Sequence, residues 1–318
     1  MPTLTSEQIS AAFIEETAIA LNRKAAMAIP ADVMTRFDQL IAMETEPLSL
    51  LVLEQIKANA ELAIESGRPM CGDTGCPRYY VKIGNDAPRV EGGMVGLENA
   101  LRRAVAEVTK RMPLRPNRVH PLTRADHDNN VGMHAPDVTY SYEPDADWID
   151  ITAVHKGGLF GSDYRMLFPG DGIKGIKRFF LDAVAEFNRR GLACPPSVVG
   201  IGLGGTQDFT MRLGMEAACL RYVPDRNPDP KIAELEEELA ELGNRAGFGP
   251  MGFPGGTAIA AVKIEAAYAH TGGMPMAVHH FCHATRRATV RIYPDGRAEF
   301  RDDPQWFTDY YRRVAVTW

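Results

Sequence analysis

Cysteine is scarce in this chain: there are five among 318 residues, and no two of them form a Cys-x-x-Cys pair. The missing pairs exclude the usual zinc-ribbon and ferredoxin patterns. A small, odd number of cysteines in a chain this long also argues against a disulfide framework. Each cysteine is therefore expected to be a buried apolar side chain, a catalytic thiol or a metal ligand.

The chain also lacks an excess of basic residues and a long apolar run. Its formal net charge is −6, and no basic patch builds up, which argues against a nucleic-acid partner. No stretch approaches the length of a membrane span, and the N-terminus lacks the pattern of a secretory signal. We expect a cytoplasmic protein that binds neither nucleic acid nor membrane, while a few local arginines still permit a small anionic substrate.

What the chain does contain is typical of a globular protein, with 45% apolar and 24% charged residues. The first sixty-five or so residues have a helical pattern, with Thr5 and Gln8 as a capping box ahead of Ile9. Further helices are expected over 96–112, 173–187, 211–220 and from Pro230. Strands are expected over 79–83, 138–142, 148–154 and 197–203, and apolar segments lie near 258–267 and 277–282. No composition shift marks a boundary, so we expect one mixed α+β domain over residues 1–318.

Three cysteines occur where elements end. Cys71 opens the polar turn Cys71-Gly72-Asp73-Thr74-Gly75, Cys194 precedes two prolines, and Cys282 ends an apolar strand. Side chains at element ends can converge on a site. Cys219, inside a helical pattern, is expected in the core, and Cys76 fits either role. Spacing alone leaves open whether any of them binds a metal.

The residues that flank these cysteines point to a family. The chain contains, in order, Cys71-Gly-Asp-Thr-Gly, Tyr80-Val-Lys-Ile-Gly, Pro113-Leu-Arg, Lys156-Gly-Gly, Ala193-Cys-Pro-Pro, Asn227-Pro-Asp-Pro, Gly247-Phe-Gly-Pro and a late Cys282 followed by Ala284 and Arg286-Arg287. Together they resemble the class I fumarases, and most closely the α subunit of the two-subunit L-tartrate dehydratase and fumarase forms. The resemblance covers about residues 30 to 295.

The resemblance implies a set of site residues. Cys71, Cys194 and Cys282, which are 123 and 88 residues apart, match the family's ligands for a [4Fe–4S] cluster. Asp73 would handle a proton or position a hydroxyl, and His270 would be a second catalytic residue. The candidate substrate-binding residues are Thr74, Arg115 and Gly158, because arginine binds carboxylates with two parallel hydrogen bonds and glycine permits a close backbone approach.

The resemblance also implies the activity. With three thiolate ligands, one iron stays open as a Lewis acid, which suits a hydro-lyase that adds or removes water on a small hydroxy-carboxylic acid. The chain ends where single-chain relatives continue into another domain, so it resembles an α subunit that needs a separate β subunit. Homodimerisation of the α subunit is expected as well.

Two positions depart from the family pattern. Gly72 stands where the family usually has glutamine, and Gly157–Ser162 replaces a run of three glycines and a small polar residue. Both changes flank the expected site. The substrate is therefore expected to differ from plain fumarate or malate, and to be bulkier or less polar at one end.

Other interpretations remain open from the sequence. A non-catalytic cluster protein, acting as a sensor or scaffold, would carry the same cysteines. A zinc enzyme would use Cys282 with His283. The glycines at 200, 202, 204 and 205 suggest a phosphate loop, but their spacing does not fit Gly-x-Gly-x-x-Gly and no ribose-binding acid follows.

Overall fold

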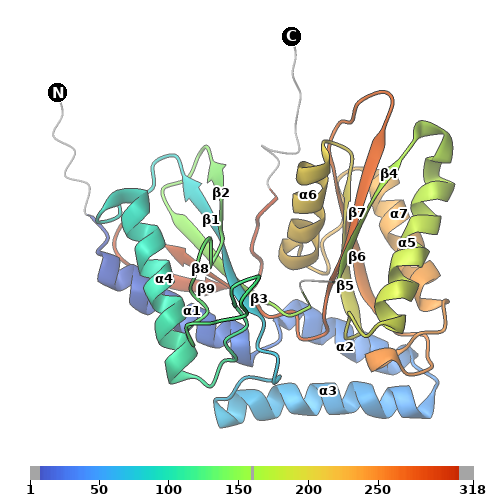
Figure 1. The fold of residues 1–318 in the computed structure, drawn as a ribbon, viewed down its shortest axis with the longest axis horizontal. Helices are drawn as coiled ribbons and strands as arrows, with labels where there is room; N and C mark the ends of the chain where they lie inside the picture. Colours follow the sequence, from blue (N-terminus) through green and yellow to red (C-terminus); the bar gives the residue numbers. More distant parts are fainter. Residues whose placement is uncertain (1–7, 159–160, 308–318) are drawn as a thin grey trace. The chain divides into compact units, whose positions relative to one another are not determined.

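The fold is that of a computed structural model, which describes residues 8–158 and 161–307 (Figure 1). Contacts divide the chain into two compact units. The first unit takes the N-terminal segment up to Pro30, Leu62–Lys156 and the segment from Arg286 onward, and the second takes Ala31–Glu61 and Gly157–Thr285. α3 (Pro47–Ser66) runs from the second into the first. Each unit has its own sheet, and the expected α+β class is confirmed, while a single domain over residues 1–318 stays a prediction.

The first unit has a five-stranded sheet with the strand order β2-β1-β3-β8-β9. Its strands are β1 (Cys76–Gly84), β2 (Val138–Glu143), β3 (Ile149–Lys156), β8 (Arg287–Ile292) and β9 (Ala298–Arg301). β1 pairs with β2 in parallel, and the other neighbours are antiparallel. α1 (Ala11–Met27) and α4 (Gly93–Arg111) pack on one face, where Leu21, Leu101, Val81 and Ile151 belong to a common apolar core.

The strands of this sheet also carry buried polar groups. The Asp150 carboxylate accepts two hydrogen bonds of 2.7 Å from Arg291, and the hydroxyls of Thr152 and Thr289 are 2.9 Å apart. Lys82 is 1% exposed and donates to the carbonyl of Gln305. Burial lowers the pKa of Lys82 to about 8, against the opposing effect of Glu143.

The second unit has a four-stranded sheet with the order β4-β7-β5-β6. Its strands are β4 (Ser162–Leu167), β5 (Ser197–Leu203), β6 (Ile259–Ala266) and β7 (Met274–Phe281), and only β5 and β6 pair in parallel. Its helices are α2 (Ala31–Met43), α5 (Gly172–Arg189), α6 (Gln207–Leu220) and α7 (Pro230–Asn244), with the single-turn helices η1 (Pro169–Asp171) and η2 (Pro250–Gly252). α6 covers one face of the sheet, and α5 and α7 share an apolar core with the other (Figure 1).

The glycines of β5 allow α6 to pack closely on it. A Cβ atom at Gly202 would lie 1.9 Å from the carbonyl oxygen of Thr210, and one at Gly200 would lie 2.2 Å from that of Gly214. Both distances are far below contact distance, so only glycine fits. Gly200 and Gly202 of the cluster that resembles a phosphate loop are thus accounted for by helix packing.

The outer edge of β6 is held by side chains instead of a further strand. Asn244 bonds both the N–H and the carbonyl of Ile259, and the Arg36 guanidinium donates to the carbonyl of Ala260 over 2.7 Å. Farther along, the N–H of Ile264 donates to Glu236 over 2.7 Å, and its carbonyl accepts from Asn227. Most strand edges expose such groups to solvent.

Most expected elements are present, but the start of the first helix is a correction. Thr5 lies outside the described residues, and the helix begins at Ala11, with the Ser10 hydroxyl accepting from the N–H of Phe13. Ile9 is not helical because its N–H and carbonyl bond Arg89 and Glu91. Three strands were not expected from the sequence: β4, β8 and β9.

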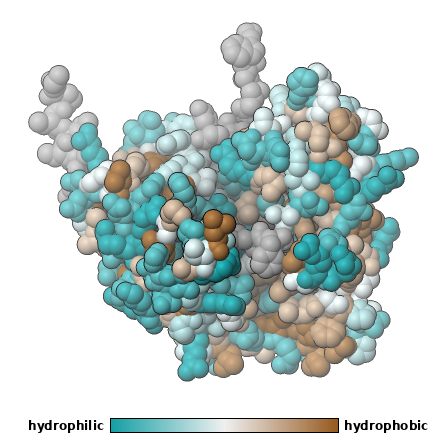
Figure 2. All heavy atoms as spheres, in the orientation of Figure 1, coloured by the Kyte–Doolittle hydropathy of each residue, from teal (hydrophilic) through white to brown (hydrophobic). Residues whose placement is uncertain are grey.

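The surface of α3 keeps large apolar side chains exposed, with Leu48, Leu51 and Leu62 each at least half accessible. Brown atoms gather along the lower edge of Figure 2, where α3 lies in Figure 1. Among the residues that the structure describes, no helix is long and apolar enough to cross a membrane.

Candidate functional site

In the first unit, the turn between α3 and β1 fixes the carboxylate of Asp73. Its Oδ1 atom accepts a hydrogen bond from the N–H of Gly75 over 3.1 Å and another from the side-chain amide of Asn117 over 2.8 Å. The same amide donates to the Gly75 carbonyl over 3.0 Å. Asp73 is therefore oriented by two donors and keeps its second oxygen for other partners.

The backbone of Arg115 is held at both ends of the residue. Its N–H donates to the hydroxyl of Thr74 over 2.9 Å, and its carbonyl accepts from Asn130 over 3.1 Å. Asn130 is 1% exposed, and its side-chain oxygen accepts from the N–H of Asn117. These bonds leave the exposed Arg115 side chain on a fixed base.

Asp73, Thr74 and Arg115, each chosen from the sequence, therefore belong to one hydrogen-bonded network. Asn117 and Asn130, which complete it, were not chosen. Asn117 follows two residues after Arg115, and Asn130 has a φ of 58°, a conformation that asparagine tolerates better than most residues. The position of Asn117 next to the Arg115 motif was a signal that could have identified it, whereas the backbone angle of Asn130 cannot be seen in the sequence.

Buried cations lie next to this network. Arg286 is 2% exposed and donates to the carbonyls of Asp73, over 2.5 Å, and His155, over 3.1 Å. Lys156 is fully buried. Burial, with Arg286 beside it, lowers the pKa of His155 to about 3, so this imidazole is neutral and pairs with Asn22 over 2.7 Å. Buried positive charge of this kind favours an anionic ligand.

In the second unit, two of the expected cluster ligands lie at neighbouring corners. β5 and β7 are antiparallel, with Val198 opposite Phe281, so the residues before β5 and after β7 lie at the same end of the sheet. The N–H of His283 donates to the carbonyl of Cys194 over 2.9 Å, which joins the two corners directly. Neither Cys194 nor Cys282 is in a disulfide, and both are half-buried.

The other three cysteines differ in how accessible their thiols are. Cys71 is free and exposed, in the turn that also carries Asp73, whereas Cys76 and Cys219 are buried. Burial raises the pKa of the Cys76 thiol, which disfavours the thiolate that a metal needs. Cys219 is 0% exposed on α6, which confirms its expected place in the core.

Gly158 has a conformation that suits its expected role. Its φ is +56°, and a Cβ atom there would lie 3.1 Å from the carbonyl oxygen of Leu192. Its own carbonyl accepts from the N–H of Gly161 over 2.8 Å. The residues between them, Leu159 and Phe160, lie outside the described residues.

His270 is not brought beside Cys282. It lies in the turn that precedes β7, while Cys282 follows the same strand, so the eight residues of β7 separate them. Its Nδ1 atom accepts from the N–H of Gly272 over 3.0 Å, and the side chain is exposed. The catalytic role of His270 stays a prediction.

No three Cys, His, Asp or Glu side chains within residues 8–158 and 161–307 gather as they would around a metal ion. The donor chemistry is nevertheless suited to an iron–sulfur cluster. Cys71, Cys194 and Cys282 are free thiols outside the buried core, and clusters of this kind are held by cysteine thiolates.

Comparison with known proteins assigns the chain to a family. The sequence profile of the family described as fumarate hydratase (fumerase) matches residues 15–291. The chain is 38% identical over 289 residues, 89% of its length, to a Methanocaldococcus jannaschii protein named "Putative L(+)-tartrate dehydratase subunit alpha", of which the match covers 99%. It is 33% identical over 270 residues, 84% of its length, to the L(+)-tartrate dehydratase subunit alpha of Escherichia coli K12, of which the match covers 86%.

Proposed function

The chain belongs to the fumarate hydratase family, and we propose that it is the α subunit of an iron–sulfur hydro-lyase acting on a small hydroxy-carboxylic acid. The observation that carries this proposal is the network that joins Asp73, Thr74 and Arg115 through Asn117 and Asn130. The network holds a carboxylate and an arginine on one fixed backbone. Removal of water from a hydroxy acid requires groups of both kinds.

Each residue of the network has a role in the proposed reaction. Arg115 binds a substrate carboxylate with two of its N–H groups, and Arg286 supplies positive charge beside Asp73. Asp73 handles a proton in the reaction or positions the substrate hydroxyl, with its carboxylate oriented by Gly75 and Asn117. Thr74, through the Arg115 N–H, sets the position of the arginine.

Cys71, Cys194 and Cys282 would hold the [4Fe–4S] cluster. When bound, the cluster supplies a Lewis-acidic iron that makes a hydroxyl a better leaving group. Support for this ligand set comes from the contact between the Cys194 and Cys282 corners and from the family match.

The partner, the compartment and the substrate are proposed on separate grounds. The relatives are named as α subunits, so we propose that a separate β subunit completes the enzyme. We also propose that the α subunit forms a homodimer. We place the enzyme in the cytoplasm because all five cysteines are free. The substrate is proposed to be bulkier or less polar at one end than malate, because Gly72 replaces an amide side chain beside Asp73.

The cluster is tested by cysteine substitutions in the protein purified without oxygen. Iron, zinc and acid-labile sulfide are measured for the wild type and for C71S, C194S and C282S. Each variant is expected to lose most of its iron and sulfide, because three ligands are needed to hold the cube. C219A is the matched control and should retain both, since that thiol is buried in the core. Zinc without sulfide in the wild type would contradict the proposal.

The activity is tested by co-expression with a β subunit. Hydration and dehydration of malate, tartrate and larger 2-hydroxy acids are followed for the pair and for the α chain alone. We expect turnover only by the pair. A full cluster with no turnover of any acid by the assembled pair would favour a sensor or scaffold instead.

A further inference from the structure

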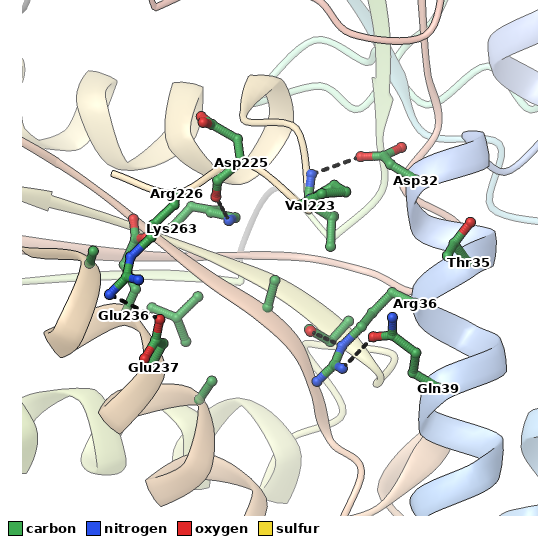
Figure 3. Close-up of a pocket in the computed structure, with 16 residues that line it drawn as sticks. Asp32, Thr35, Arg36, Gln39, Val223, Asp225, Arg226, Glu236, Glu237 and Lys263 are labelled. Carbon is green, nitrogen blue, oxygen red and sulfur yellow. Dashed lines mark hydrogen bonds and ion pairs between the residues drawn. The ribbon is translucent and has the colours of Figure 1, made fainter. Parts of the chain in front are cut away.

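A pocket of about 350 Å³ opens in the second unit, and none of the residues assigned above to the proposed site lines it. It lies between α2, α7, the loop after α6 and the outer edge of β6 (Figure 3). Its volume is at the lower end of the range for small-molecule sites. Small apolar residues line part of it, among them Ala233, Ala240, Ala260 and Val262.

The acidic groups that line the pocket are already engaged. Asp32 accepts from the N–H of Val223 over 2.9 Å, and Glu236 accepts from the N–H of Ile264. Asp225 accepts from Arg221 over 2.8 Å, and Glu237 lies 3.4 Å from Arg226 at the exposed rim. Each of these carboxylates therefore already has a donor or cation of the protein as partner, and each keeps its negative charge.

Arg36 differs from the other two cations of the pocket. Arg226 lies 3.4 Å from Glu237, and the charge of Lys263 is favoured by the nearby carboxylates of Glu236 and Asp225. Its Nε atom donates to the carbonyl of Ala260 and its Nη1 atom to the side-chain oxygen of Gln39, and both acceptors are neutral. Within the described residues no carboxylate lies within ion-pair distance of it. Burial alone lowers the pKa of Arg36, whereas carboxylates around the buried Arg221 outweigh burial and raise that residue's pKa.

A half-buried guanidinium without a counter-ion is costly unless an anion binds it, because its desolvation is not repaid. Arginine remains protonated at any physiological pH, so its charge cannot be relieved by loss of a proton. Figure 3 shows the Arg36 side chain extending from α2 toward β6, with its guanidinium at the edge of the apolar lining.

We propose that this pocket is a second ligand site, which takes a small monocarboxylate with a short apolar body. The carboxylate pairs with the free N–H groups of Arg36, and the apolar body contacts Ala240 and Val262. Four acidic against three basic side chains line the pocket, so a second negative charge on the ligand is disfavoured. The site therefore discriminates against the dicarboxylates that the proposed catalytic site would bind.

Binding is measured by calorimetry on the full chain, with butyrate and benzoate as probes. Both are expected to bind weakly but saturably, while butyramide, which lacks the charge, and succinate, which has a second one, bind at least about tenfold more weakly. R36Q is expected to weaken butyrate binding by about tenfold or more. R245Q, in an exposed pair with Glu241 outside the pocket, is the matched control and should bind as the wild type does.

Two further variants distinguish binding in this pocket from a folding defect and from binding at the proposed catalytic site. A240L fills the pocket without altering Arg36, so it should also abolish binding even if R36Q folds poorly. R115Q should leave butyrate binding unchanged, since Arg115 belongs to the proposed catalytic site. Equal binding to the wild type and A240L, loss of binding in R115Q, or succinate binding as tight as butyrate would each overturn the proposal.

Discussion

Asn117 and Asn130 hold together the hydrogen-bonded network of the candidate site. Asn130 is buried and bonds the backbone of both Arg115 and Asn117, and Asn117 then orients Asp73. Hydrogen bonds to charged groups contribute about 1.5–3 kcal/mol each. Small changes at either asparagine should therefore be felt at the carboxylate and at the arginine.

Replacing Asn117 with alanine removes the side-chain donor to Asp73. Loss of one hydrogen bond to a carboxylate is expected to lower kcat/KM of the assembled enzyme by about ten- to a hundredfold. Steady-state assays of N117A with the co-expressed β subunit measure this. N85A, an exposed asparagine in the same unit with no side-chain bond within the described residues, should leave the rate unchanged. An N117A enzyme as fast as the wild type would show that Asp73 needs no orienting donor.

Gly72 gives a direct test of substrate choice. A Cβ atom there would meet nothing within 4 Å, so G72Q, which restores the glutamine usual in the family, should fold without loss of stability. The added amide is expected to raise the ratio of kcat/KM for malate to that for larger hydroxy acids by about tenfold, the scale of one hydrogen bond. Competition assays with paired substrates measure the ratio. An unchanged ratio would show that this position does not select the substrate.

Among the helices and strands, regular patterns were predicted well and short strands were not. β5 occurs over Ser197–Leu203 as expected, because a buried apolar run between prolines and glycines has few alternatives. β4 and β9 are mostly exposed strands without apolar alternation, and their pairing depends on distant partners. Such pairings are a tertiary effect that a local pattern does not contain.

The two histidines of β7 show that burial also depends on the elements that cover a strand. His279 and His280 are both buried, at 2% and 3% exposed. As strand alternation requires, they point to opposite faces: His279 lies against Gly214 of α6, and His280 stacks edge-on with Phe187 of α5. Both are buried because helices cover both faces of the sheet.

The packing of α6 on β5 can be tested at Gly202. The Cβ atom of alanine would lie 1.9 Å from the Thr210 carbonyl oxygen, so G202A must push the helix away. We expect a loss of about 3 kcal/mol in the free energy of unfolding, at the upper end for overpacked cores. Urea denaturation measures it. G170A, where an added Cβ meets nothing within 4 Å, should unfold at the wild-type midpoint, and equal stability of the two variants would contradict the close approach.

For the molecule as a whole, Lys82 sets a pH dependence of stability. Burial lowers its pKa to about 8 from 10.5, although Glu143, Asp150 and Asp303 oppose this. Between these values the unfolded chain binds the proton and the folded one does not, so stability rises with pH. The wild type should gain about 2 kcal/mol relative to K82M between pH 8 and 9.5.

Denaturation midpoints of the wild type and K82M at pH 7, 8, 9 and 9.5 measure this gain. The comparison stays below pH 10 because tyrosines begin to ionise at that pH. The pKa values of Tyr79 and Tyr140 are raised in the folded protein, so their ionisation would change stability in the opposite direction. A constant difference between the two proteins across this range would mean that Lys82 titrates as an exposed lysine does.

For the candidate site, the sequence names residues but does not contain their arrangement. Motif order identified Asp73, Thr74 and Arg115, and the structure joins them through neighbours that the motifs did not single out. The order of the motifs did not reveal that the chain leaves the first unit at Pro30, returns at Leu62 and leaves again after Lys156. Such crossings depend on long-range packing, and composition shows no boundary there.

The edge of β6 has a consequence for the chain in a crowded solution. A strand with unsatisfied backbone groups on one side can recruit a strand from another molecule, which is how ordered aggregates grow. Asn244, Arg36, Glu236 and Asn227 occupy those groups along β6, so an incoming strand would have to displace them all. Substituting Asn244 with alanine should leave the fold intact but increase light scattering and thioflavin fluorescence on mild heating, because it frees both backbone groups of Ile259.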